Sequence, residues 1–255
     1  MIKQFKKLVF RSVSLENYLR ILQRSYFFLY NTKILKLSSN YTHHYYAGKL
    51  IKKGDTVIDI GANLGYYSIL FAKWVGNMGK VYSVEPIKIY NKIFNEKARK
   101  YNNIVLYPYA LGLEEKKIEM VSSPHTGYLN TGLPHVYDAE QDGEIENAEF
   151  CFEAEMKVPA KLFASLDRIN YIKCDIEGFE YNVLSNMKDI INERRPIVQV
   201  EVWKDNDNAI NKLFSEMGYL PYKIKKNKLV LIYSDKDKEI KGDYIFIPKE
   251  KELNI

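Results

Sequence analysis

Cysteine and long apolar runs are the first things this sequence lacks. Its 255 residues include only two cysteines, Cys151 and Cys174, too few for the disulfide framework that stabilises small secreted domains. No stretch of about 18 apolar residues is present to form a membrane-spanning helix. The N-terminus is basic but lacks the continuous apolar core and small-residue cleavage site of a secretory signal. We therefore expect a cytoplasmic protein in a reducing compartment.

Neither disorder nor low complexity fits the composition. Hydrophobic residues make up 46% of the chain and charged residues 27%, which are ordinary values for a globular protein. We see no internal repeat. A chain of this length corresponds to one large α/β domain, or to one domain with an extension.

Charge is distributed unevenly along the chain. Residues 1–53 hold eleven Lys and Arg and a single acid, Glu16, so this segment carries +10 whereas the remainder carries −4. Apolar residues between 15 and 29 recur at spacings of three and four, which predicts an amphipathic helix. We expect residues 1–53 to form a basic helical extension that contacts an anionic membrane surface peripherally, at its inner face, or is simply solvated. No finger or RNA-stacking motif accompanies the charge, so nucleic acid is not expected as a partner.

From residue 54 the pattern changes to strands alternating with helices. Strands are expected at 56–60, 81–85, 104–107, 117–121, 171–175, 197–202, 229–233 and 244–247. Helices are expected at 68–75, 88–101, 180–192 and 208–217. This alternation predicts a largely parallel sheet covered by helices on both faces, in one domain over 54–255.

Acidic residues lie at the ends of four of the expected strands. They are Asp59, Glu85, Asp175 and Glu201. Ligands of parallel α/β sheets bind beyond the carboxyl ends of the strands. A single such acid is commonly a helix cap or half of a surface ion pair, but four together indicate a site.

The turn after the first strand favours one class of cofactor. It reads Gly61-Ala-Asn63-Leu-Gly65, whereas dinucleotide-binding turns read G-x-G-x-x-G so that the backbone can cradle a pyrophosphate. Glu85 ends the next strand, where a carboxylate accepts hydrogen bonds from ribose hydroxyls. NAD and S-adenosylmethionine both contain such a ribose, so Glu85 indicates an adenosine cofactor, and the turn argues against NAD.

Four segments together resemble the FkbM-type family of S-adenosylmethionine-dependent methyltransferases. They are residues 55–68 (DTVIDIGANLGYYS), 84–86 (VEP), 110–112 (ALG) and 172–180 (IKCDIEGFE). The last segment is the most specific, and the resemblance spans roughly residues 50–203. It implies a Rossmann-like, seven-stranded, mostly parallel sheet and transfer of a methyl group to oxygen, often on a sugar or natural-product hydroxyl.

The resemblance also implies roles for individual residues. Asp59, Gly61, Asn63 and Gly65 would line the methionine side of the cofactor, Glu85 would hold the ribose, and Tyr109 and Ala110 would lie near the adenine. Asp175, Glu177 and Glu180 match the acidic residues of the last motif. Asp175 would contact the cofactor, orient the acceptor or act as a base. Glu177, Glu180 and Glu201 are candidates for binding the acceptor, with favourable placement of acids at a helix N-terminus as the alternative.

An alcohol acceptor must lose its proton as it is methylated, which requires a general base or a metal ion. The candidate bases are Asp175, His125 and His135. Asp175, Glu177 and Glu201 offer the oxygen ligands that magnesium prefers, but no spacing specific to metal sites is present, and we predict no metal.

Residues 123–149 contain six acids and neither Lys nor Arg. A loop this long in a compact domain is usually a lid, a binding loop or disordered. We interpret the segment as an acidic lid over the acceptor, in which Tyr128 stacks on a sugar ring, with a solvated loop as the alternative.

Three functions remain open from the sequence. The first is methyl transfer from S-adenosylmethionine to a hydroxyl of a sugar, glycan or glycolipid-like acceptor. The second is NAD-dependent oxidoreduction, and the third is a non-catalytic protein that retains the cofactor pocket. The acceptor's identity and the oligomeric state cannot be read from the sequence.

Overall fold

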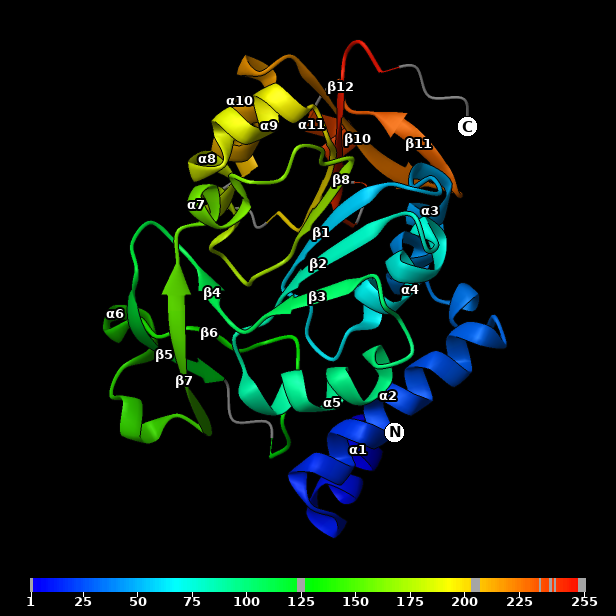
Figure 1. Cartoon of the computed structure of the whole chain (residues 1–255). Helices are drawn as coiled ribbons and strands as arrows, with labels where there is room; N and C mark the ends of the chain where they lie inside the picture. Colours follow the sequence, from blue (N-terminus) through cyan, green and yellow to red (C-terminus); the bar gives the residue numbers. More distant parts are fainter. Residues whose placement is uncertain are drawn as a thin grey trace.

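A mixed eight-stranded sheet forms the centre of the protein. The computed structural model describes residues 2–122, 127–202, 207–233, 235–238, 240 and 242–251. The strand order is β11-β10-β12-β9-β8-β1-β2-β3 (Figure 1). The strands are β1 (Thr56–Ile60), β2 (Lys80–Val84), β3 (Ile104–Tyr107), β8 (Tyr171–Cys174), β9 (Ile197–Val200), β10 (Tyr219–Lys225), β11 (Lys228–Leu231) and β12 (Tyr244–Pro248).

Five adjacent strands, from β3 to β9, run parallel, and β12 is antiparallel to both β9 and β10. This is the Rossmann-like sheet expected from the sequence, with one difference. The hairpin of β10 and β11 adds an eighth strand at the edge, so the expected count of seven is wrong. β10 was not expected because Pro221 interrupts it. The strand lies between β11 and β12, and Pro221 precedes the residues that pair with β11, which begin at Tyr222.

A second, four-stranded sheet in the order β4-β7-β5-β6 lies beside the main sheet, at the lower left of Figure 1. It consists of β4 (Ala110–Leu111), β5 (Lys116–Ser122), β6 (His135–Val136) and β7 (Phe150–Lys157). Along β7, the buried Ala154 and Met156 alternate with the exposed Glu153 and Glu155. The sequence therefore contained the alternation typical of a half-buried strand, although no strand was expected there. The segment expected to be a lid joins β5 to β7 and contains β6, α6 (Ala139–Asp142) and the 3-10 helix η3 (Ile145–Asn147).

Helices cover both faces of the main sheet. α3 (Thr42–Leu50), α4 (Tyr66–Val75) and α5 (Lys88–Ala98) lie on one face, and α7 (Pro159–Phe163), α8 (Glu180–Asn186), α9 (Lys188–Arg194) and α10 (Asp207–Glu216) lie on the other. A short α11 (Asp235–Lys238) precedes β12. The expected helix at 180–192 is two helices, because the chain leaves helical geometry at Met187.

The N-terminal extension is helical, with α1 (Ile2–Ser12) and α2 (Leu15–Asn31) followed by the 3-10 helices η1 (Ile34–Leu37) and η2 (Ser39–Tyr41). The apolar face of α2 packs on the sheet domain, where Tyr18 and Leu19 are buried together with Leu64 and Ile93. Arg20 of α2 forms an ion pair with Glu96 of α5, 2.7 Å apart. Part of the charge of this segment is therefore used in internal contacts.

Candidate active site

The turn between β1 and α4 is shaped by left-handed backbone. Gly61 and Gly65 have φ of +81° and +79°, and Asn63 has φ of 52°, a conformation that asparagine tolerates better than most residues. A Cβ on Gly61 would lie 1.8 Å from the carbonyl oxygen of Asp175. Glycine at this position therefore lets the loop after β8 approach the turn.

Glu85 lies directly after β2 and faces the same turn. Its carboxylate accepts hydrogen bonds from the backbone N–H groups of Asn63 and Ile87, each at 2.8 Å. Burial raises the pKa of Glu85 to about 7. The carboxylate is thus held in place by backbone donors and keeps lone pairs for a ligand hydroxyl.

A cavity of about 260 Å³ opens at this point, at the carboxyl ends of the parallel strands. Its walls come from the glycine turn, the segment after β2, the loops after β8 and β9, and the start of the lid segment. Of the residues expected to bind ligands, Gly61, Asn63, Glu85, Asp175, Glu177 and Glu201 line it. The tertiary structure therefore brings together both groups of residues that the sequence indicated.

Lys173 is a member of this site to which the sequence interpretation gave no role. It lies inside β8, is 2% exposed, and its ammonium is 2.9 Å from Oδ2 of Asp175. Although burial opposes a charge, the carboxylates of Asp175 and Asp59 raise the pKa of Lys173. A lysine within an apolar strand was the available signal, because buried lysines are almost always paired.

Asp175 and Glu201 form a coupled acid pair on one wall of the cavity. Burial by itself would raise the pKa of Asp175, but the charge of Lys173 and a hydrogen bond with Glu201 lower it. Burial and the neighbouring Asp175 charge raise the pKa of Glu201 to about 9. At neutral pH Asp175 is therefore ionised, while Glu201 keeps its proton and donates it to the hydrogen bond.

Two glutamates of the acidic motif, Glu177 and Glu180, take different positions in the loop after β8. Glu177 and Gly178 adopt φ of 55° and 101°, and Glu177, whose pKa is raised to about 8 by burial and by Asp175, lines the cavity. Glu180 is fully buried, and its carboxylate accepts hydrogen bonds from the backbone N–H groups of Ile176 and Gly178. Glu180 therefore fixes the loop and does not reach the cavity.

Two residues of the glycine motif also lie outside the cavity. Asp59 is fully buried within β1, where Oδ2 accepts a hydrogen bond of 2.5 Å from Ser68 while Oδ1 has no partner. Gly65 begins α4 against the ring of Phe94. Asp59 and Gly65 therefore hold the glycine turn in place without lining the cavity.

His44 and Tyr66 also line the cavity and were not identified from the sequence. The ring of His44 stacks on Tyr67 with centroids 4.0 Å apart, and its Nδ1 lies 2.6 Å from the hydroxyl oxygen of Tyr26. Burial, followed by the charge of Lys173, lowers the pKa of His44 to about 3. The ring is therefore neutral at pH 7. Tyr66 belongs to the quoted segment 55–68 but had no role assigned to it, whereas His44 lies in α3, outside every motif, and reaches the site only through tertiary packing.

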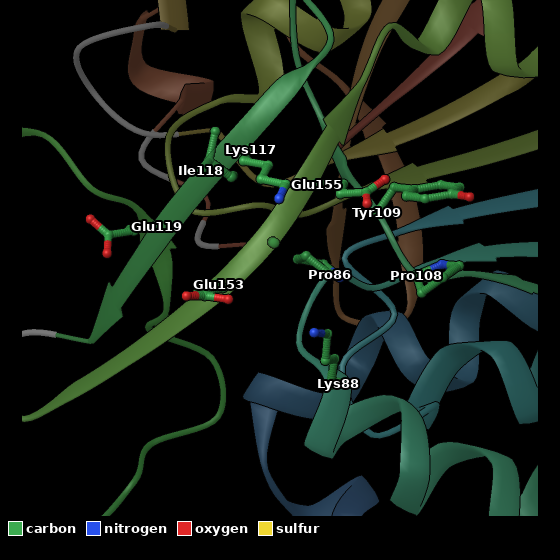
Figure 2. Close-up of a pocket in the computed structure, with 10 residues that line it drawn as sticks. Pro86, Lys88, Pro108, Tyr109, Lys117, Ile118, Glu119, Glu153 and Glu155 are labelled. Atoms are coloured by element: carbon green, nitrogen blue, oxygen red, sulfur yellow. The ribbon is translucent and has the colours of Figure 1, made fainter.

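An apolar recess adjoins the cavity and shares Gly61 and Pro86 with it. Tyr109 and Ala110 line the recess, as expected for the adenine side. Tyr109 and Pro86 also border a wider cavity of about 760 Å³ between the two sheets. Figure 2 shows Lys88 at its lower edge and the carboxylates of Glu153 and Glu155 opposite.

The lid segment reaches the cavity through few residues. Gly132 and Pro134 line it, and Asn63 donates a hydrogen bond of 2.6 Å to the carbonyl of Thr131. His135 uses both ring nitrogens inside the segment, bonding Leu133 O at 3.0 Å and Asp142 at 2.9 Å. The structure places His135 as a tie within the lid and not at the cavity.

Two further expected residues are not brought to the site. Tyr128 is 7% exposed and packs in the core with Tyr18 and Leu129, so its ring is not available to stack on a sugar. His125 lies outside the described residues. Of the three candidate bases, Asp175 is the one that the structure places at the cavity.

Comparison with known proteins decides the family. The Methyltransferase FkbM domain matches residues 59–221, which contain the glycine turn, Glu85 and the acidic loop. The chain belongs to the FkbM methyltransferase family. The cofactor of this family is S-adenosylmethionine and not NAD, and the glycine turn, Glu85 and the acidic loop all lie within the matched residues.

A solved FkbM methyltransferase from Methylobacillus flagellatus superposes with a TM-score of 0.53 at 15% identity, covering 81% of this chain and 48% of that one. The present chain thus spans about half the length of that relative. An S-adenosylmethionine-dependent O-methyltransferase from Thermotoga maritima gives 0.42 at 13% identity, covering 83% and 66% of the two chains. Fibrillarin from Aeropyrum pernix, with natively bound S-adenosylmethionine, gives 0.43 at 11%, covering 78% and 68%. A search of curated protein sequences finds no match.

The residues of this FkbM chain fit S-adenosylmethionine. Glu85 offers carboxylate oxygens for the ribose hydroxyls, and the recess at Ala110, of about 30 Å³, offers an apolar surface on the adenine side. Asp175, Glu177 and Glu201 also present oxygen atoms within 4.8 Å of one another, a set that could hold a divalent cation. Lys173 already neutralises Asp175, which weakens that possibility.

Among the described residues, no helix is long and apolar enough to cross a membrane.

Proposed function

We propose that this FkbM methyltransferase transfers a methyl group to a hydroxyl of a sugar, glycan or glycolipid-like acceptor. The observation that carries the proposal is the Lys173–Asp175–Glu201 cluster, in which the carboxylate of Asp175 lines the cavity, lies 2.9 Å from the buried ammonium of Lys173 and shares a hydrogen bond with Glu201. Such a carboxylate can accept the proton that an alcohol loses during methylation. The neutral His44 and the phenol of Tyr66 provide a wall that suits a sugar ring.

The proposed roles follow from position. S-adenosylmethionine supplies an electrophilic methyl group on a sulfonium. Glu85 holds the ribose, and Asn63 positions Glu85 through its backbone N–H. Asp175 orients the acceptor hydroxyl and takes its proton as the oxygen–carbon bond forms and the carbon–sulfur bond breaks. Glu177, whose pKa is about 8, is mostly protonated at pH 7 and can donate a hydrogen bond to a neighbouring acceptor oxygen. Positioning of this kind supplies a large part of the rate enhancement.

The first test is a calorimetric titration of the purified chain with S-adenosylhomocysteine, with NAD as the comparison. We expect micromolar binding of S-adenosylhomocysteine and no binding of NAD. An acceptor screen then follows release of S-adenosylhomocysteine from S-adenosylmethionine in the presence of neutral and charged saccharides. Methylation of a nitrogen or carbon in place of a hydroxyl, seen by mass spectrometry of the product, would contradict the proposed reaction.

A further inference from the structure

A second cavity lies on the other side of Glu201 from the proposed cofactor site. It measures about 870 Å³ and is lined by the N-terminal segment from η1 to α3 and by the C-terminal segment 224–243. Glu201 lines both cavities. Between them, Gln199 bridges Tyr67 of the inner cavity, at 3.3 Å, and Asp243 of the outer cavity, at 2.5 Å. The outer cavity is therefore placed to receive an acceptor that extends to Asp175.

Lysines dominate the wall of this outer cavity. Lys36 and Lys49 come from the N-terminal side, and Lys225 and Lys226 from the hairpin of β10 and β11. All four are exposed, and none of them forms an ion pair within the described part of the chain. Among the described residues, these four ammonium groups are therefore left without a carboxylate at ion-pair distance.

The opposing acids of this cavity are already engaged. Asp243 accepts a hydrogen bond from Gln199 at 2.5 Å, and Glu201 is bonded to Asp175. His43 also lines the cavity, is only 7% exposed, and has an Nε2 atom without a hydrogen-bond partner.

The hairpin turn itself favours a specific placement of charge. Lys226 and Asn227 adopt φ of 48° and 60°, the geometry for which Asn-Gly is the usual sequence. A lysine at the first of these positions is disfavoured locally. Lys226 and its neighbour in the chain, Lys225, both line the cavity.

We infer that the outer cavity binds a negatively charged group of the acceptor, a phosphate or a carboxylate carried on the saccharide whose hydroxyl is methylated. The inference rests on the proposed function and specifies its substrate class. Ammonium groups attract both anions as point charges, and a lysine-lined cleft concentrates the field that guides an anionic ligand inward. The shared chemistry is thus an anion next to a sugar hydroxyl, and the test distinguishes its two sources.

The test is calorimetric titration of the full chain, saturated with S-adenosylhomocysteine, with glucose 1-phosphate, glucuronate and glucose. We expect binding of one or both charged sugars, weaker binding at high salt, and no binding of glucose. The double variant Lys225→Glu/Lys226→Glu and the variant Lys36→Gln/Lys49→Gln, which changes the opposite wall, should each weaken this binding about tenfold or more, the scale of a lost charge-assisted hydrogen bond.

A matched control is the double variant Lys100→Glu/Lys212→Glu, since both of these lysines are exposed and lie outside the outer cavity. Unchanged affinity for S-adenosylhomocysteine in each variant shows that the fold and the cofactor site are intact. Equal loss of anion binding in the control, equal binding of glucose, or no binding of either charged sugar would overturn the inference. So would binding of phosphatidylglycerol vesicles alone, which would assign the lysines to a lipid surface.

Failure of the inference and failure of the proposed function give different results. A chain that binds S-adenosylhomocysteine but neither charged sugar keeps the proposed function and loses the anionic acceptor. A chain that binds no S-adenosylhomocysteine contradicts the proposed function and, with it, the inference.

Discussion

The proposed cofactor side and the proposed acceptor side of the site are built in different ways. The cofactor side uses one stretch of chain, from the glycine turn at residue 61 to Ala110. The acceptor side combines α3, the loops after β8 and β9, and the C-terminal segment 224–243. Parts of the acceptor side are therefore about 200 residues apart in the sequence.

This contrast shows which features a short motif can carry. Adjacent parallel strands end at the same edge of the sheet, so Gly61 and Glu85 come together from local patterning alone. His44 and Lys226 meet the site only because the N-terminal helices and the terminal hairpin pack on the same face. If the two sides act independently, substitutions on one side should change the affinity for the cofactor, and substitutions on the other should change turnover of the acceptor.

The largest separation is expected from Asp175→Asn. Removal of the proposed base should lower kcat by about 10²- to 10⁴-fold, while the affinity for S-adenosylhomocysteine changes little because Glu85 and the turn are untouched. Turnover assays and calorimetry on the same preparation measure the two effects. Asp189→Asn, at an exposed aspartate of α9, is the matched control and should leave kcat unchanged.

Chelation sharpens the same prediction. Because Lys173 already supplies positive charge to Asp175, dialysis against EDTA should leave turnover unaltered. Loss of activity that magnesium restores would instead assign the carboxylates of Asp175, Glu177 and Glu201 to a metal ion.

Glu85→Gln should produce the complementary result. An amide cannot accept from both backbone donors and both ribose hydroxyls with the strength of a carboxylate, so S-adenosylhomocysteine should bind about 10- to 100-fold more weakly. Calorimetry gives this affinity, with the exposed Glu153→Gln as control. An affinity within threefold of the wild type would show that the ribose lies elsewhere.

A smaller effect, on the acceptor only, is expected from Asp142→Asn. This substitution weakens the tie between Asp142 and His135 that holds the lid segment, so the KM for the acceptor should rise a few-fold. The KM for S-adenosylmethionine should not change. Among the described residues, the lid segment is joined to the glycine turn by the hydrogen bond that Asn63 donates to the carbonyl of Thr131, and the substitution leaves this bond in place. Steady-state kinetics with each substrate varied in turn separates the two constants, and a parallel rise in both would contradict a lid that acts on the acceptor.

A pH-dependent change in stability is expected from Glu201→Gln. The pKa of Glu201 is raised from about 4.5 to about 9, so the folded state keeps a proton that the unfolded chain releases. The resulting stabilisation is fully present below pH 4.5 and is lost as the pH rises towards 9. The variant has no such loss. The difference between its Tm and that of the wild type should therefore increase between pH 5 and pH 9, by on the order of 2–4 °C for each kcal/mol of stability that the wild type loses. Thermal unfolding at several pH values measures this, and Tm curves that stay parallel would show that Glu201 is ionised in the folded protein.

The smallest effect concerns the basic N-terminal segment. Phe10 of α1 packs edge-on against Tyr18 and Phe150, with centroids 5.0 and 5.9 Å away. We expect contact with a membrane to be electrostatic, through basic residues such as Lys7 and Arg11. Sedimentation with anionic vesicles should show weak binding that salt abolishes, and equal binding to neutral vesicles would exclude an electrostatic role.

Several elements were predictable because their patterns are local. β1 is a run of β-branched residues ended by Gly61, and α4 ends at Gly76 with φ of +65°. Asp59, Glu85, Asp175 and Glu201 were correctly placed at strand ends. Lys173 was missed although its partner Asp175 is only two residues away in the chain. Whether that lysine is buried at a cavity depends on the strands and loops packed around β8, which no local pattern shows.

By itself the sequence determined the alternation of strands and helices, the glycine turn and the carboxylate that follows the second strand. These depend on neighbouring residues, through backbone geometry and hydrophobic periodicity. Only the tertiary structure decided that Asp59 and Glu180 support the site from within, that Tyr128 lies in the core, and that Lys173 and His44 join the cavity. The reason is physical: a side chain's ionisation and access depend on what surrounds it, and those surroundings come from parts of the chain that are remote in sequence.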